Sequence, residues 1–155
     1  MNPYLALKAV HIVSSTLLFG TGLGTAFFKW SVDRSGIVPA IRVASEKVVL
    51  ADWLFTTPAI VVQAATGIAL ARQLGYPLLH GWLFAALMLF CVAGVCWLPV
   101  VALQIRMRDL ARAAEHNGQS LSERYWVLAR WWLWLGVPAF TSVMVVFWLM
   151  VDKPT

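Results

Sequence analysis

The chain has 155 residues, of which 61% are hydrophobic and only 12% are charged. That charged share is about half of what an ordinary soluble domain carries, so the composition excludes a water-soluble globular protein and predicts an integral membrane protein. The net charge of +5 would also suit a nucleic-acid-binding protein, but the basic residues gather in two connecting segments. This distribution favours a membrane-topology signal, and no nucleic-acid partner is predicted.

Long apolar runs predict four transmembrane helices, because one bilayer crossing needs about 20 apolar residues. The predicted spans cover about residues 5–30, 50–72, 78–105 and 128–151 of a single domain, 1–155. We therefore predict an all-α membrane four-helix bundle with up-down-up-down topology.

Charged residues at helical spacing predict that two of the helices continue beyond the membrane. The second helix is predicted to include residues 40–52, and the third to run on to Asn117 and Gly118, where a helix would stop. Ser120 and Glu123 form a capping-box pattern that predicts the start of the fourth helix. The charges on these flanks form either a solvated helix face or a surface for a partner protein.

The basic residues also predict the orientation of the bundle. Nine of the twelve lie on one predicted side: Lys29, Arg34, Arg42, Lys47, Arg106, Arg108, Arg112, Arg124 and Arg130. The other side holds Lys8, Arg72 and Lys153. The positive-inside rule places the nine in the cytoplasm, and both termini in the periplasm, of a bacterial inner membrane. Six tryptophans near the same boundary suit an interfacial belt: Trp30, Trp53, Trp126, Trp131, Trp132 and Trp134.

The motifs of common enzymes are absent from the sequence. There is no phosphate-binding loop, dinucleotide fingerprint, paired-cysteine metal motif or nucleophile elbow, so the catalytic residues are unknown. The seven carboxylates are predicted to lie in loops or at helix ends, which excludes a carboxylate relay across the bilayer. Cys91 and Cys96 lie five residues apart on different helix faces, so no disulfide between them is predicted.

One histidine, His11, lies inside the first span, about two helical turns from its outer end. An ionisable side chain at membrane depth is costly and is a functional candidate. Imidazole is a common axial ligand of haem iron, so His11 is a candidate ligand for the metal of haem b. The alternative is a neutral histidine that is hydrogen-bonded to a neighbouring helix. Gln63 and Thr66 are the nearest polar groups by depth.

A second haem ligand could come from the third or fourth helix. His80 opens the third helix on the same side of the membrane as His11. Met88 and Met144 lie at the depth of His11 and offer a soft thioether ligand. The alternatives are an interfacial histidine and methionines that fill the core. His80 and Met88 therefore join His11 as candidate cofactor-binding residues.

Two features predict how the first two helices pack. Gly20 and Gly24 form a Gly-x-x-x-Gly pair, which predicts that they lie against a neighbouring helix. Pro58 falls within the second span and is predicted to kink it.

Several short motifs resemble a bacterial family of four-helix integral membrane proteins that is defined as a domain of unknown function. They are the opening Tyr4-Leu5-x-x-Lys8-x-x-His11, the pair Glu46-Lys47, the run Asp52-Trp53-Leu54-Phe55-Thr56-Thr57-Pro58-Ala59, and the pair Thr66-Gly67. The resemblance covers nearly the whole chain. The layout is more distantly similar to the HemJ-type protoporphyrinogen oxidases, which bind haem. This similarity implies a haem-binding role for His11, but Phe84-Ala85-Ala86 stands where those oxidases have a lysine.

Two functional hypotheses follow from the sequence. The first is a haem b-binding or redox-linked membrane protein with His11 as a ligand. The second is a cofactor-free accessory or structural subunit that docks onto a larger membrane complex or onto a second copy of the chain. Small-molecule transport is a third, weaker hypothesis, because no buried charge is predicted to line a path. The lipid bilayer is a predicted partner in every case.

Overall fold

The computed structural model describes residues 2–154, and nearly all of them are helical. Three of the long helices are α1 (Pro3–Asp33), α4 (Gly81–His116) and α5 (Glu123–Asp152). The fourth is continuous and has three segments: α2 (Val38–Ala51), η1 (Asp52–Thr56) and α3 (Thr57–Gln73). All four are long and apolar enough to cross a membrane, which confirms the prediction of an all-α protein with four spans.

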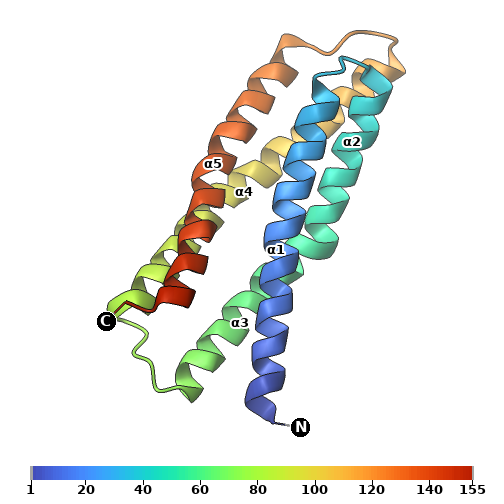
Figure 1. Ribbon diagram of the computed structural model, residues 1–155. Helices are drawn as coiled ribbons and strands as arrows, with labels where there is room; N and C mark the ends of the chain where they lie inside the picture. Colours follow the sequence, from blue (N-terminus) through green and yellow to red (C-terminus); the bar gives the residue numbers. More distant parts are fainter. Residues whose placement is uncertain (1, 155) are drawn as a thin grey trace.

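The connections and the chain termini divide the molecule into two ends (Figure 1). The connections 34–37 and 117–122 lie at one end, here called the loop end. The connection 74–80 and both termini lie at the other, here called the terminal end. The charged flanks 40–52 and 106–115 are helical and belong to the loop end. That the loop end faces the cytoplasm stays a prediction.

The helix boundaries follow from local sequence signals, with one exception. Asn2 caps α1 by accepting a hydrogen bond from the backbone N–H of Tyr4 at 3.0 Å. The helix α4 stops just before Gly118, whose φ of +60° suits glycine. The capping-box prediction at Ser120 is wrong, because residues 119–122 stay outside the helix. The N-cap of α5 is Ser122, whose side chain makes no capping hydrogen bond.

The disturbance predicted at Pro58 takes the form of the π-helical turn η1. Proline has no N–H, so the carbonyl four residues earlier loses its helical donor. The backbone N–H of Thr57, the residue before Pro58, bonds to the carbonyl of Asp52, five residues back. The Thr57 hydroxyl donates to the same carbonyl at 2.9 Å. The wide turn therefore gives the Asp52 carbonyl two donors.

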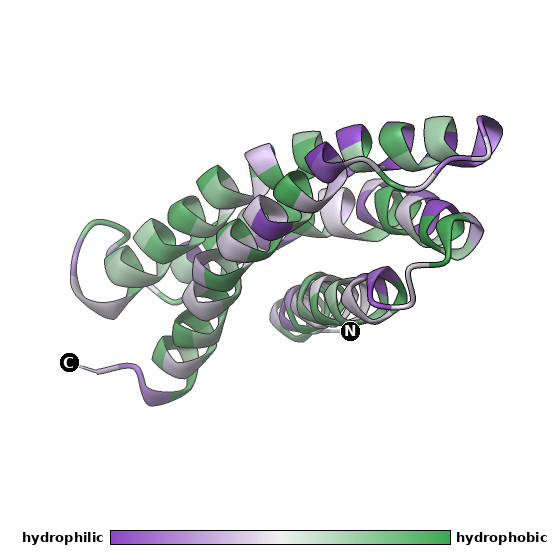
Figure 2. Cartoon of the chain, turned by 90° about the horizontal axis from the view of Figure 1, so that it is seen from above, coloured by the Kyte–Doolittle hydropathy of each residue, from purple (hydrophilic) through white to green (hydrophobic). Residues whose placement is uncertain are grey.

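The helices associate as two pairs that are joined at the loop end. Helix α4 packs along α5, and α1 packs along α3, whereas α2 packs on both α4 and α1. Contact between α1 and α5 is short. A buried core lies at the loop end and consists of Ile41, Val100, Met107, Ala111, Tyr125 and Trp132. Towards the terminal end the two pairs stand apart (Figure 1), and hydrophobic residues cover much of each helix (Figure 2).

Two sequence predictions about packing are wrong. Gly20 and Gly24 are exposed, and a Cβ built on either would meet no atom within 4 Å, so they do not pack against a helix. The reason is that α1 is apolar on nearly every side, so its sequence does not mark which face meets α3. Trp132, assigned to an interfacial belt, is instead buried in the core. The close glycine contact is made by Gly67, where a Cβ would lie 3.2 Å from Cε1 of His11.

Candidate functional site

The imidazole of His11 is hydrogen-bonded to two residues of α3. Both are the polar residues that the sequence placed nearest to His11 in membrane depth. Its Nδ1 lies 2.8 Å from the Thr66 hydroxyl, and its Nε2 lies 3.1 Å from the Gln63 side-chain nitrogen. Ser14, three residues after His11 and on the same face of α1, donates its hydroxyl to Oε1 of Gln63 at 2.5 Å. His11 and Ser14 are three residues apart, as are Gln63 and Thr66, so each pair lies on one helix face and all four side chains form one hydrogen-bond network.

The donors and acceptors of this network fix the state of the imidazole. The Thr66 hydroxyl donates its only proton to the carbonyl of Val62 at 2.6 Å, so it accepts from Nδ1–H of His11. Nε2 is then the acceptor for the Gln63 amide. The ring is neutral, both of its nitrogens are engaged, and the polar groups of α1 and α3 satisfy one another.

The other candidate haem ligands lie elsewhere. His80 is exposed at the N-cap of α4, and Met88 is exposed on the same helix. The helices that pack along α1 are α2, α3 and, briefly, α5, so the structure does not bring α4 against His11. Within residues 2–154, no group of three or more His, Cys, Asp or Glu side chains is placed to hold a metal ion.

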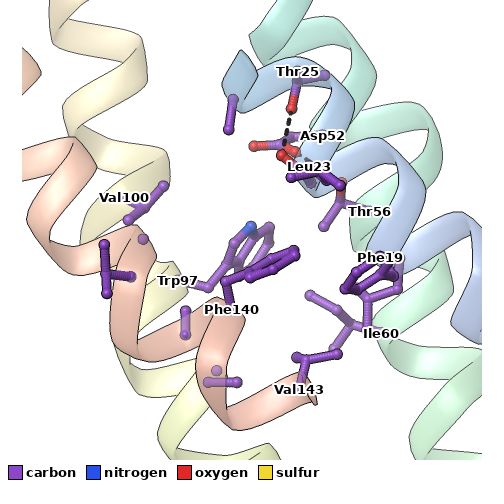
Figure 3. Close-up of a pocket in the computed structure, with 18 of the residues that line it drawn as sticks. Phe19, Leu23, Thr25, Asp52, Thr56, Ile60, Trp97, Val100, Phe140 and Val143 are labelled. Carbon is purple, nitrogen blue, oxygen red and sulfur yellow. Dashed lines mark hydrogen bonds between the residues drawn. The ribbon is translucent and has the colours of Figure 1, made fainter. Parts of the chain in front are cut away.

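An apolar crevice lies between the two helix pairs. Its volume is about 360 Å³, within the range of small-molecule sites. Figure 3 shows Asp52 and Thr56 at one end of it and the rings of Phe19, Trp97 and Phe140 farther along. Phe19 of α1 and Phe140 of α5 stack with centroids 4.8 Å apart, so they bridge the two pairs. All four long helices line the crevice.

Besides Thr56, three buried side chains with polar atoms line the crevice at its loop-end side: Asp52 on η1, Gln104 on α4 and Trp132 on α5. Their exposed fractions are 5%, 4% and 7%. Oδ1 of Asp52 accepts a hydrogen bond from the Thr56 hydroxyl at 2.7 Å, and the Gln104 side chain lies close by. Oε1 of Gln104 and Nε1 of Trp132 have no hydrogen-bond partner. The crevice is therefore lined by a carboxylate and by two side chains that each carry an unpaired polar atom.

Sequence reasoning missed this site. The prediction that every carboxylate lies in a loop or at a helix end is wrong for Asp52, which is buried inside a continuous helix. A signal was present, because Asp52 lies within an apolar run and Thr56 and Pro58 follow inside the same span. Nothing in the sequence shows that Gln104 and Trp132, from two other helices, converge on the same space.

A second buried charge cluster ties α1 to α5 at the loop end. Nζ of the fully buried Lys29 lies 2.9 Å and 3.0 Å from the two carboxylate oxygens of Asp33. The same ammonium donates to the Tyr125 hydroxyl at 2.6 Å, and that hydroxyl donates to Asp33 at 2.8 Å. Burial, together with the Asp33 carboxylate, raises the pKa of the Tyr125 phenol far above its usual range. The phenol therefore stays protonated, and the ring of three groups is closed and satisfied.

The charged flanks of α2 and α4 bind each other. Glu46 accepts hydrogen bonds from Arg42 at 3.0 Å and from Arg112 at 2.7 Å. Arg42 also pairs with Glu115. The Arg112 hydrogen bond is the main cause that holds the pKa of Glu46 below its usual value. These charges join the two helices, so they are not only a solvated face.

Comparison with known proteins gives one match. The family model described as predicted integral membrane protein, DUF2269, matches residues 5–154. No curated protein and no solved structure matches the chain, so the more distant similarity to HemJ-type oxidases stays a prediction. The matched segment covers nearly the whole of all four helices, and it includes His11, Asp52, Gln104 and Trp132. The chain therefore belongs to the DUF2269 family of integral membrane proteins.

Proposed function

We propose that this integral membrane protein binds a lipid-soluble small molecule in the crevice between its two helix pairs. One observation carries the proposal: Asp52, Gln104 and Trp132 are buried together at one end of an apolar cavity, and two of their polar atoms have no partner. The molecule would place its polar group at this end and its hydrocarbon along Phe19 and Phe140. Because the helix pairs stand apart towards the terminal end, the molecule would enter sideways from the bilayer.

Energetics support a bound molecule. A buried polar atom without a hydrogen bond costs about 1–3 kcal/mol. A ligand that carries matching polar atoms would remove the cost at Gln104 and Trp132 and gain apolar burial as well. By contrast, the groups around His11 already satisfy one another, so they stabilise the contact between α1 and α3.

Haem does not suit the crevice. None of the residues that line it is a His, Cys, Met or Tyr, which are the side chains that ligate haem iron. The carboxylate of Asp52 would also repel the propionates of haem. At His11, iron would have to displace Gln63 from Nε2. Ligation of haem b by His11 thus stays a prediction from the sequence. A Soret band in protein from haem-sufficient cells that is lost in His11→Ala would establish it.

Photolabelling tests the proposed function. The probe is hexadecanol with a diazirine on its chain, added to purified protein in phosphatidylglycerol nanodiscs. We expect saturable adducts on crevice residues such as Phe19 and Phe140, because the probe's hydroxyl can reach the polar end while its chain follows the apolar wall. Gly136→Leu, which puts a side chain into the crevice, should remove these adducts.

Gly20→Leu is the matched control. Gly20 is an exposed helical glycine that does not line the crevice, and a Cβ there meets no atom within 4 Å. This variant should keep the crevice adducts. Adducts spread evenly over the lipid-facing surface of all three proteins would overturn the proposal. The cofactor-free accessory or structural subunit, with a membrane protein or a second copy as partner, would then be the better account.

We further propose that the loop end faces the cytoplasm of a bacterial inner membrane. Nine of the twelve Lys and Arg residues support this orientation, with Arg42, Arg108 and Arg112 on the helical flanks of the loop end. Fusions at the C-terminus measure it directly. An alkaline phosphatase fusion should be active and a green fluorescent protein fusion dark, because both domains would lie in the periplasm. The reverse pair of signals would contradict the orientation.

A further inference from the structure

The carboxylate of Asp52 has no cationic partner within the protein. It is 5% exposed, and its side-chain donors are both neutral: the hydroxyl of Thr56 and the amide of Gln104. None of the ion pairs formed among residues 2–154 includes Asp52, whereas the other buried carboxylate, Asp33, is neutralised by Lys29. A buried charge is normally paired or neutralised, because its transfer out of water is costly. Asp52 thus lacks the counter-charge that its burial requires.

The side chain of Gln104, next to Asp52, carries a further acceptor. Oε1 of Gln104 has no donor, and the Gln104 side chain lies close to the carboxylate. A group that satisfies both oxygens must bring hydrogen-bond donors. An ammonium group brings up to three donors and a positive charge, whereas a hydroxyl brings one donor and no charge.

Aromatic rings line the next part of the crevice. Trp97 of α4 lies beside the stacked pair Phe19 and Phe140, as Figure 3 shows. The faces of aromatic rings attract cations, and a tryptophan face does so most strongly. The same rings offer apolar surface to a hydrocarbon chain. The apolar stretch from Asp52 to Ile60 rises by roughly 12 Å along the helix, and both residues line the crevice.

We propose that the ligand of the crevice is a lipid-soluble organic amine in its protonated form. Its ammonium donates to the Asp52 carboxylate and to Oε1 of Gln104, and its hydrocarbon lies along the aromatic wall towards Ile60. This inference rests on the proposed function and names the chemical class of the ligand. The amine can be a free amphiphile or the headgroup of an aminophospholipid, because both present the same ammonium.

Competition against the diazirine-hexadecanol probe tests the amine. Dodecylamine, dodecanol and dodecyltrimethylammonium are titrated against crevice labelling in phosphatidylglycerol nanodiscs. Because charged hydrogen bonds are stronger than neutral ones, dodecylamine should compete at about a tenfold lower concentration than dodecanol. The quaternary compound, which has charge but no N–H, should fall between them. Adding phosphatidylethanolamine to the nanodiscs identifies the source: a weaker effect of dodecylamine shows that the lipid headgroup occupies the site, and an unchanged effect shows a free amine.

Two carboxamide variants give the matched comparison. Asp52→Asn should bring dodecylamine and dodecanol to equal potency, while crevice labelling itself shows that the variant is folded. Asp152→Asn changes an exposed carboxylate at the end of α5 and should keep the preference for the amine. Equal competition by dodecylamine and dodecanol in the unmodified protein would overturn the proposal that the ligand is an amine. The proposed function, binding of a lipid-soluble molecule, would remain. Absence of saturable crevice labelling in the unmodified protein would overturn both.

Discussion

Replacing Lys29 by methionine is expected to lower the free energy of unfolding by about 3–5 kcal/mol, the cost of leaving one member of a buried ion pair without its partner. Methionine keeps most of the length of the lysine chain but removes the ammonium that binds both oxygens of Asp33 and the hydroxyl of Tyr125. Asp33 would then retain one donor, the phenol. Titration with sodium dodecyl sulfate in mixed micelles, followed by tryptophan fluorescence, measures the change.

Two variants show whether the loss comes from the unpaired charge. Lys47→Met removes an exposed lysine from α2 and should change stability little. The double variant Lys29→Met/Asp33→Asn removes both charges and should recover a large part of the loss, because the asparagine carbonyl can still accept from Tyr125. A Lys29→Met protein as stable as Lys47→Met would contradict a closed buried cluster.

Gly67→Leu is expected to destabilise the protein by about 1–3 kcal/mol, the usual cost of overpacking a tight contact. A Cβ at Gly67 already comes within 3.2 Å of Cε1 of His11, and the imidazole cannot move aside without lengthening its bonds to Thr66 and Gln63. The same detergent titration measures this change. Separation of α1 from α3 would follow from the larger side chain.

Gly20→Leu is again the control, since it places the same side chain on an open face of α1. Its free energy of unfolding in the detergent titration should equal that of the unmodified protein. If Gly20→Leu were the more damaging of the two, the first helix would be rotated about its axis, and the Gly-x-x-x-Gly pair would be the true contact.

The number of helices and the partners of His11 could be predicted because they depend on position along the chain. Apolar length marks a membrane crossing, and each residue of a helix advances by a fixed rise, so depth can be counted from the ends. Counting depth placed Gln63 and Thr66 level with His11, and the structure has both in hydrogen-bond contact with it. The helical form of the charged flanks followed from their periodicity.

Rotation of each helix about its axis could not be predicted in the same way. In a soluble protein the polar face marks the outside, but here lipid covers the outside and apolar residues occur all round. The sequence therefore pointed to the wrong face of α1 at Gly20 and did not reveal that Asp52, Gln104 and Trp132 face a common space. Their convergence depends on three helices at once, and no local pattern records it.

The π turn at Asp52–Thr56 also has a meaning in evolutionary terms. A π turn is equivalent to one residue inserted into an α-helix, and one residue corresponds to about 100° of rotation. Before the turn the helix packs on both α4 and α1, and after it the same helix packs on α1. One inserted codon thus sets which face the continuous helix presents beyond the turn, and its removal would turn the face of α3 that carries Gln63 and Thr66 away from His11.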